Sequence, residues 1–379
     1  MYIPYGRQWI EDDDIEAVVK VLKSDFLTTG PTVSEFEKTV AEYTGAKYAV
    51  AVSNGTAALH IACLAAGIRE GDEVITSPIT FAASANCALY CGGKPVFADI
   101  DAKTYNISPQ SVYEKITEHT KAIIPVHYTG QPCNMDEIHA IAKEHNLLVI
   151  EDGAHALGAS YKGKKIGGLS DMTIFSFHPV KHITTGEGGM VLTNNEELYK
   201  KLLYFRTHGI TRDTSLMEKN EGAWYYEQID LGFNYRITDF QCALGISQLK
   251  KLDKFVARRK EIAKKYNEAF ANLPWVITPY QEENCDSSWH LYVIKLQGID
   301  RKEIFDKLRE DGIGVNVHYI PVYHHPYYQK YGYEGVYCKN AEDLYANCIS
   351  IPMYPGLTKE EQDYVIEKIK EAGKNYGYN

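Results

Sequence analysis

The stretch Ser176-Phe177-His178-Pro179-Val180-Lys181-His182-Ile183-Thr184-Thr185-Gly186-Glu187-Gly188-Gly189 joins two apolar runs near the middle of the chain. The runs at 172–177 and 190–193 predict buried strands. Lys181 lies between them among hydroxyls, histidines and glycines, with no acidic residue within five positions. A single lysine is usually a solvated surface charge, but burial disfavours the ammonium form, lowers the pKa and frees the amine to attack a carbonyl. The sequence therefore predicts that Lys181 is a reactive amine.

An acidic residue that could work with this lysine follows another apolar run. The run 147–150 predicts a strand, and Asp152 comes two residues after it. Open α/β sheets bind their ligands at the carboxyl ends of strands. Asp152 could instead cap the next segment, but its pairing with Lys181 favours a functional role. Pyridoxal phosphate (PLP) uses a lysine for its Schiff base and a carboxylate for its pyridinium nitrogen, so we expect Lys181 and Asp152 to bind PLP.

Length and composition exclude several classes of protein. A chain of 379 residues allows one large and one smaller domain, and a net charge of −10 argues against a nucleic-acid partner. The eight cysteines contain no Cys-x-x-Cys pair, so neither a zinc ribbon nor a redox pair is indicated. No signal peptide and no apolar run of about 18 residues are present. We expect a cytoplasmic protein without a membrane partner.

Strands and helices alternate at short spacing before residue 200. Tyr48–Val52 predicts a strand that is followed by a small polar loop and a helix. Ala122–Val126 predicts another strand, and Met135–His145 predicts the helix after it. This alternation predicts an α/β fold with a mostly parallel sheet between helices. No Gly-x-Gly-x-x-Gly lies between a strand and a helix, so a dinucleotide site lacks support.

The second part of the chain predicts a smaller α/β domain. A long helix at about 240–270 is expected to cross the boundary, which we place near residue 250. Beyond it, Ile313–His318 predicts a strand, and helices are predicted at 302–309 and 358–372. The expected domains are therefore a large cofactor-binding domain at 1–250 and a small C-terminal domain at 251–379.

Two motifs make the chain resemble a known family. Glu-Asp-x-x-His-x-x-Gly begins at Glu151, and Phe-Ser-Phe-His-Pro-x-Lys-x-Ile-Thr-Thr-Gly-Glu-Gly-Gly begins at Phe175. Both resemble the DegT/DnrJ/EryC1/StrS family of fold-type I, PLP-dependent sugar aminotransferases, and the similarity covers nearly the whole chain. It implies a mostly parallel, seven-stranded sheet in the large domain. Within the family, the chain resembles the nucleotide-sugar 4-aminotransferases of pseudaminic acid biosynthesis, through segments 224–227, 231–236, 289–292, 317–322 and 326–328.

The resemblance also implies how the cofactor ring is held. It assigns Asp152 to the ring nitrogen and His155 to the side of the ring near the phenolic oxygen, where an ordinary buried histidine is the alternative. Phe81 opens a predicted helix just past a strand end and would be a core residue by default. The resemblance places an aromatic side chain against the pyridine face, so we expect Phe81 to stack there.

The cofactor phosphate is assigned to a loop between a strand and a helix. A helix N-terminus of this kind can bind an anion, and the resemblance implies that Gly55, Thr56 and Ser176 hold the phosphate. It also implies that Asn234 reaches the phosphate bound by the other subunit, which makes the protein a homodimer with shared active sites. The alternative for Asn234 is an ordinary turn.

Substrate contacts are expected from three residues. The resemblance places Thr29 near the active site, although a simple turn explains its loop nearly as well, and it suggests His318 and Tyr319 as contacts. Among the histidines, His178 and His182 are four apart, but Pro179 disfavours a helical metal site. No carboxylate pattern supports metal binding, so we expect no metal.

The resemblance implies that L-glutamate gives its amino group to C4 of a UDP-linked sugar. That sugar is the 4-keto-6-deoxy-N-acetylhexosamine UDP-2-acetamido-2,6-dideoxy-β-L-arabino-hexos-4-ulose. Dehydratases of the same family carry histidine at the position of Lys181, so the lysine favours transamination. One alternative is an aminotransferase for another nucleotide-linked 4-keto or 3-keto sugar. An inactive nucleotide-sugar sensor is a second alternative, which Lys181 and Asp152 disfavour.

Overall fold

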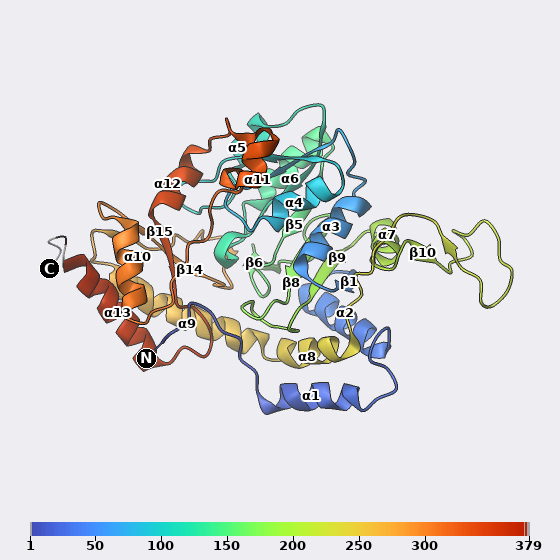
Figure 1. Ribbon diagram of the computed structural model, residues 1–379, viewed down its shortest axis with the longest axis horizontal. Helices are drawn as coiled ribbons and strands as arrows, with labels where there is room; N and C mark the ends of the chain where they lie inside the picture. Colours follow the sequence, from blue (N-terminus) through green and yellow to red (C-terminus); the bar gives the residue numbers. More distant parts are fainter. Residues whose placement is uncertain (1, 375, 377–379) are drawn as a thin grey trace.

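The computed structural model describes residues 2–374 and 376, and a seven-stranded sheet with order β1-β9-β8-β5-β4-β2-β3 forms its centre (Figure 1). Strand β9 is antiparallel to both of its neighbours, while the other adjacent pairs are parallel. The prediction of a mostly parallel, seven-stranded α/β sheet is therefore confirmed. The strands are β1 (Tyr48–Val52), β2 (Glu73–Thr76), β3 (Lys94–Phe97), β4 (Thr120–Ile124), β5 (Leu148–Asp152), β8 (Met172–Ser176) and β9 (Gly189–Thr193).

Hydrophobic cores cover both faces of this sheet. Because successive side chains of a strand point to opposite faces, Ile123 of β4 joins one core, while Ala122 and Ile124 join the other. Two-sided burial explains why the strands are almost continuously apolar. The first core includes α2 (Pro31–Thr44), α6 (Met135–His145) and α8 (Asp239–Leu249), and the second includes α3 (Gly55–Ala65), α4 (Ala83–Tyr90) and α7 (Glu196–Arg206).

A third core surrounds a three-stranded antiparallel sheet in the C-terminal region. Ile3 belongs to this core and forms a bridge with Ile313, so the start of the chain packs against the C-terminal region. Figure 1 shows α10 and α13 near the two chain ends. The sheet has the order β12-β14-β15, with β12 (Val276–Ile277), β14 (Tyr292–Leu296) and β15 (Cys348–Ile351), and the helices of this core are α9 (Leu252–Phe270), α10 (Arg301–Glu310) and α13 (Lys359–Lys374).

The predicted strand at Ile313–His318 is wrong. This segment forms only isolated bridges, Ile3 with Ile313 and Asn316 with Ser350. The side-chain oxygen of Asn316 accepts the N–H of Val317 at 2.8 Å, which takes that donor away from a strand ladder. The chain is therefore extended but irregular where it reaches His318.

The single helix predicted at about 240–270 is two helices. Helix α8 ends at Leu249 and α9 begins at Leu252. At the break, Lys251 Nζ lies 2.7 Å from carboxylate oxygens of both Asp13 and Asp14, at the start of α1 (Asp12–Leu22). The break coincides with the expected domain boundary near residue 250, which stays a prediction.

A long excursion follows α7. Strands β10 (Ile210–Thr211) and β11 (Glu227–Gln228) pair, and Figure 1 shows this segment extending away from the body of the molecule. Trp224 is 72% exposed there. The excursion thus contains one short two-stranded pairing.

The remaining elements are short connections or local additions. No helix in the described part of the chain is long and apolar enough to cross a membrane. These elements are α5 (Pro109–Glu114), β6 (Ser160–Tyr161), β7 (Lys164–Lys165), β13 (Cys285–Asp286), α11 (Pro326–Tyr328) and α12 (Lys339–Asn347), with short helical turns at Tyr128–Gly130, Val322–His324 and Gln329–Tyr333.

Candidate active site

A cavity of about 1000 Å³ lies at the carboxyl ends of β5 and β8. Its walls come from the sheet edge, from the start of α3 and from the C-terminal region at 316–320. The position is the one expected for a ligand site in an open α/β sheet. The predicted residues that line the cavity are Gly55, Thr56, Phe81, Asp152, His155, Ser176, Lys181, His318 and Tyr319.

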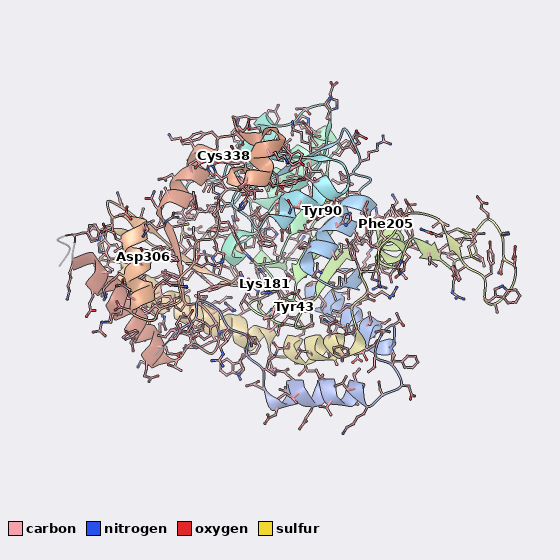
Figure 2. The ribbon with its side chains drawn as sticks, viewed as in Figure 1. Tyr43, Tyr90, Lys181, Phe205, Asp306 and Cys338 are labelled. Atoms are coloured by element: carbon pink, nitrogen blue, oxygen red, sulfur yellow. The ribbon has the colours of Figure 1, made fainter. Side chains whose placement is uncertain are left out.

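Lys181 lies near the middle of the molecule in the view of Figure 2. Its Nζ is 3.5 Å from Nε2 of His290, and it forms no ion pair with a carboxylate in the described part of the chain. The pKa of Lys181 is lowered to about 8, chiefly by burial; the charge of Asp152 opposes this shift, and the charge of Arg259 adds a smaller lowering. A useful fraction of Lys181 is therefore a free amine near neutral pH.

Asp152 is a buried carboxylate at the end of β5. Its Oδ2 accepts a hydrogen bond from Ser84 Oγ at 2.6 Å, and its Oδ1 accepts the N–H of Ala154 at 3.1 Å. It has no ion-pair partner among residues 2–374 and 376. Because a buried charge without a counter-charge is unfavourable, this site fits a ligand that presents a protonated ring nitrogen.

The start of α3 fits a phosphate group. Asn54 Oδ1 accepts the N–H of Ala57 at 2.8 Å, while the N–H groups of Gly55 and Thr56 have no intrahelical partner because they begin the helix. A Cβ atom on Gly55 would lie 3.0 Å from Cβ of Ser176, so glycine allows the Ser176 side chain to approach the helix start. Backbone donors, a hydroxyl and the helix dipole together favour an anion here.

The cavity has a cluster of ring side chains around His155, and a separate exposed ring, that of Phe81. Nε2 of His155 lies 3.1 Å from the hydroxyl of Tyr319, and its ring centroid is 4.2 Å from that of His290. Phe81 is 64% exposed and lines the cavity, where a ligand ring could cover it. The prediction that Phe81 opens a helix is wrong, since α4 begins at Ala83 and Phe81 lies in the preceding turn.

His318 is held at the back of the C-terminal wall. Its Nδ1 lies 2.7 Å from Ser350 Oγ, and the hydroxyl of Tyr128 donates to its carbonyl oxygen at 2.5 Å. Burial lowers the pKa of His318 to about 4, with a smaller contribution from Lys181. His318 is therefore neutral at physiological pH and can offer a hydrogen bond but no charge.

Two predicted residues are not brought to the cavity. Thr29 and Asn234 are exposed and do not line it. Thr28 forms a bridge with Thr238, four residues after Asn234, so Thr29 and Asn234 lie toward the same part of the surface. Within one chain, neither residue belongs to the cavity wall, although Tyr235, next to Asn234, does.

Two residues near Lys181 were missed by sequence reasoning. His290 contacts Lys181 although the two residues are 109 positions apart, and no local sequence pattern predicts such a contact. Arg259 follows Arg258 and precedes Lys260 in a charged segment that predicts a solvated helix face, yet it is 1% exposed.

No group of three or more His, Cys, Asp or Glu side chains in the described residues is arranged to hold a metal ion.

Comparison with known proteins identifies the family. Residues 8–370 match the DegT/DnrJ/EryC1/StrS aminotransferase family. The chain belongs to this family. An uncharacterized protein of Methanocaldococcus jannaschii is 47% identical, and the spore coat polysaccharide biosynthesis protein SpsC of Bacillus subtilis is 43% identical; both alignments cover 98% of this chain and 97% of the relative. The UDP-4-amino-4,6-dideoxy-N-acetyl-β-L-altrosamine transaminase of Campylobacter jejuni is 40% identical, over 98% of this chain and 99% of its own.

Solved structures agree with this assignment. PseC of Helicobacter pylori, an aminotransferase involved in pseudaminic acid biosynthesis, superposes with a TM-score of 0.93 at 33% identity, over 99% of this chain and 100% of PseC. Spr1654 of Streptococcus pneumoniae, solved in PLP and PMP (pyridoxamine phosphate) forms, gives TM-scores of 0.92 and 0.93 at 32% identity; the alignments cover 98–99% of this chain and 99% of Spr1654. The protein is therefore a PLP-dependent sugar aminotransferase of fold-type I.

Proposed function

We propose that this enzyme transfers the amino group of L-glutamate to C4 of UDP-2-acetamido-2,6-dideoxy-β-L-arabino-hexos-4-ulose. The observation that carries the proposal is one cavity that contains a lysine of lowered pKa, an unpaired buried carboxylate and a helix N-terminus. The similarity to the C. jejuni transaminase and to PseC supports the choice of sugar.

In the proposed reaction, Lys181 is the residue that moves protons. When bound, PLP supplies a carbonyl carbon for amine exchange and a ring that accepts electrons. Lys181 Nζ would take a proton from the carbon that carries the amino group and return a proton to the carbon on the other side of that nitrogen, a 1,3-shift. Holding this base beside the reacting carbon removes an entropic barrier worth up to about 7–11 kcal/mol.

Other residues hold the reacting groups in place. Asp152 keeps a proton on the ring nitrogen, and His155 and Phe81 orient the ring. Gly55, Thr56 and Ser176 bind the phosphate. His318 and Tyr319 are the proposed contacts of the sugar, since both belong to the C-terminal segment 316–320 that lines the cavity.

A homodimer with shared active sites is part of the proposal. Lys181 is the one Lys or Arg among the described residues that line the cavity, so a single chain offers little charge to a UDP diphosphate. Thr29 and Asn234 are exposed on the same chain. We propose that Asn234 of the partner subunit completes each phosphate site.

Borohydride trapping tests the first half of the proposal. The protein is loaded with PLP, reduced, digested and mapped by mass spectrometry. We expect the pyridoxyl label on the peptide that contains Lys181, and we expect the yellow colour of the unreduced enzyme to fade when L-glutamate is added. Lys181→Ala should take no label there. An unlabelled, colourless wild-type protein would contradict the proposal and favour a nucleotide-sugar sensor.

A panel of nucleotide-linked keto sugars tests the second half. SpsC, at 43% identity, is slightly more similar to this chain than the C. jejuni transaminase, at 40%. Another 4-keto or 3-keto sugar is therefore the second candidate. NMR of the product gives the position and stereochemistry of the new amino group, and an enzyme that ignores the UDP-4-keto sugar but aminates another member of the panel would select this candidate.

A further inference from the structure

His290 is a buried residue of the cavity wall, between β13 and β14, and the chemistry above leaves it without a role. It is 4% exposed, and its Nε2 lies 3.5 Å from Nζ of Lys181. Its ring centroid is 4.2 Å from that of His155 and 5.5 Å from that of His182. The imidazole thus stands between the reactive lysine and two other histidines.

The charge state of His290 decides which way this hydrogen bond runs. Burial holds the pKa of His290 well below its usual value, and the nearby His155, Lys181, His182 and Arg259 lower it further. A neutral imidazole has one donor nitrogen and one acceptor nitrogen, while an ammonium group only donates. Nε2 of His290 therefore accepts from protonated Lys181, and Nδ1 carries the hydrogen. In the described residues, Nδ1 has no partner of its own.

The backbone N–H and the backbone carbonyl of His290 both form hydrogen bonds. Its N–H donates to the carbonyl oxygen of Thr129 at 2.7 Å. Its carbonyl oxygen accepts from Nη1 of Arg259 at 3.0 Å, and the same nitrogen also contacts the carbonyl oxygens of Trp289 at 3.2 Å and Met353 at 2.9 Å. These contacts fix the imidazole relative to α9 and the segment after β15.

Arg259 is unusual because its buried guanidinium makes these contacts without a carboxylate. No acidic residue in the described part of the chain forms an ion pair with it. A buried, unpaired cation is unfavourable for stability unless its donors are satisfied. Two of the three carbonyl oxygens that Arg259 Nη1 contacts belong to Trp289 and His290. Arg259 therefore holds the connection between β13 and β14 that carries His290.

We propose that His290 is a positioning residue, whose Nε2 accepts a hydrogen bond from Lys181 Nζ and holds the ε-amino group at the cavity wall, while Arg259 fixes the main chain of His290. The inference rests on the proposed role of Lys181. A lysine side chain loses rotamer entropy when it is held in one place. A fixed acceptor supplies that order whenever Lys181 Nζ is not bonded to the cofactor, and so keeps Nζ aimed at the reacting carbon.

Labelling of the cofactor-free protein tests the contact without any need for turnover. The pH dependence of reductive methylation of the Lys181 peptide, followed by mass spectrometry, reports the pKa of this amine. His290→Leu removes the acceptor and should lower that pKa, because the ammonium form loses its partner. His290→Gln retains an acceptor oxygen and should stay closer to the wild type. The charged and titratable groups that face this pair are Asp152, His155, His182, Arg259 and His318, and all variants retain them.

A matched control and a kinetic readout separate positioning from folding. His139 bonds Ser170 at 2.7 Å outside the cavity, so His139→Leu should change neither Lys181 nor catalysis. His290→Leu should lower kcat by about 100-fold with little change in KM for the amino donor, since a misplaced catalytic group can lose that much rate. A His290→Leu protein with an unchanged Lys181 pKa and a kcat within about twofold of wild type would overturn the inference.

Histidine NMR gives a second test that does not need the leucine variant to fold. In ¹⁵N-histidine-labelled protein below pH 8, His290 should be the tautomer with hydrogen on Nδ1, assigned by its absence from the His290→Gln spectrum. Lys181→Ala should shift the Nε2 signal of His290 and leave that of His139 in place. A hydrogen on Nε2 would overturn the inference. Failure of borohydride labelling would instead count against the role of Lys181, and the two failures are therefore distinguishable.

Discussion

The ionisation of Lys181 sets the pH at which the cofactor-free protein can capture PLP. Burial lowers the pKa of this amine from 10.5 to about 8. Only the unprotonated amine attacks a carbonyl, so the free fraction rises with pH through this value. The rate of PLP capture, followed by the appearance of yellow colour, should increase up to about pH 8 and then level off. A rate that keeps rising toward pH 10.5 would show that Lys181 is not desolvated, and Lys181→Ala gives the background.

We expect catalysis to depend on the charge of Asp152. Asparagine keeps the shape of this side chain and removes its charge, so it separates the two properties. Asp152→Asn should fold normally, as judged by circular dichroism, and lose about 10- to 100-fold in kcat, since a hydrogen bond to a charged group contributes about 1.5–3 kcal/mol. Ser84→Ala provides the comparison. It removes one neutral donor from Asp152 Oδ2 and leaves the charge, so its loss should be smaller. Equal losses in both variants would assign Asp152 a structural role.

Single residues differ in how far the sequence could predict their place in the cavity. Lys181 and Asp152 each follow a buried strand, and strand ends meet at one edge of a parallel sheet, so their convergence could be predicted. His290 and Arg259 could not be predicted in this way. Their contacts join segments that are far apart in sequence, and the burial of Arg259 contradicts its charged neighbourhood.

The junction of α3 with the end of β8 is the element on which phosphate binding should depend. A Cβ atom on Gly55 would lie 3.0 Å from Cβ and 3.2 Å from Oγ of Ser176. Gly55→Ala should therefore push Ser176 away and weaken PLP binding by about tenfold, the effect of losing one hydrogen bond to a charged group. Titration of the cofactor-free protein with PLP measures this change. Gly335→Ala is the matched control, because a Cβ atom there would meet nothing within 4 Å.

At the scale of elements, local patterns predicted the main sheet well and the C-terminal region less well. Tyr48–Val52 and Met135–His145 have the predicted bounds, since apolar runs and capping residues are local signals. The break between α8 and α9 depends on Lys251 reaching the carboxylates at the start of α1, more than 200 residues away. Ile313–His318 is apolar enough for a strand, but Asn316 takes a backbone donor from it. A long-range ion pair accompanies the first error, the missed break between α8 and α9. A side chain that competes for a backbone donor accounts for the second, the strand predicted at Ile313–His318.

The whole molecule places its cavity between the main sheet and the C-terminal region, and leaves two family-assigned residues outside. The start of α3, Asp152 and Lys181 come from the side of the main sheet, whereas His290 and His318 come from the C-terminal region. Thr29 and Asn234 remain on the surface of the same chain. A second copy that brings Asn234 to this cavity would explain why the two residues are exposed on their own chain.

Mixing two inactive variants tests this arrangement of the whole molecule. Let one protein carry Lys181→Ala and the other Asn234→Ala. If each site combines Lys181 with Asn234 of the partner subunit, a mixed dimer has one site with both substitutions and one intact site. Unfolding and refolding equal amounts together should then restore about a quarter of the wild-type activity, because half of the dimers are mixed and each contains one working site. If Asn234 serves its own chain, every site keeps one substitution and the mixture gains nothing over the average of its parts. Size-exclusion chromatography with light scattering checks that dimers form in each sample.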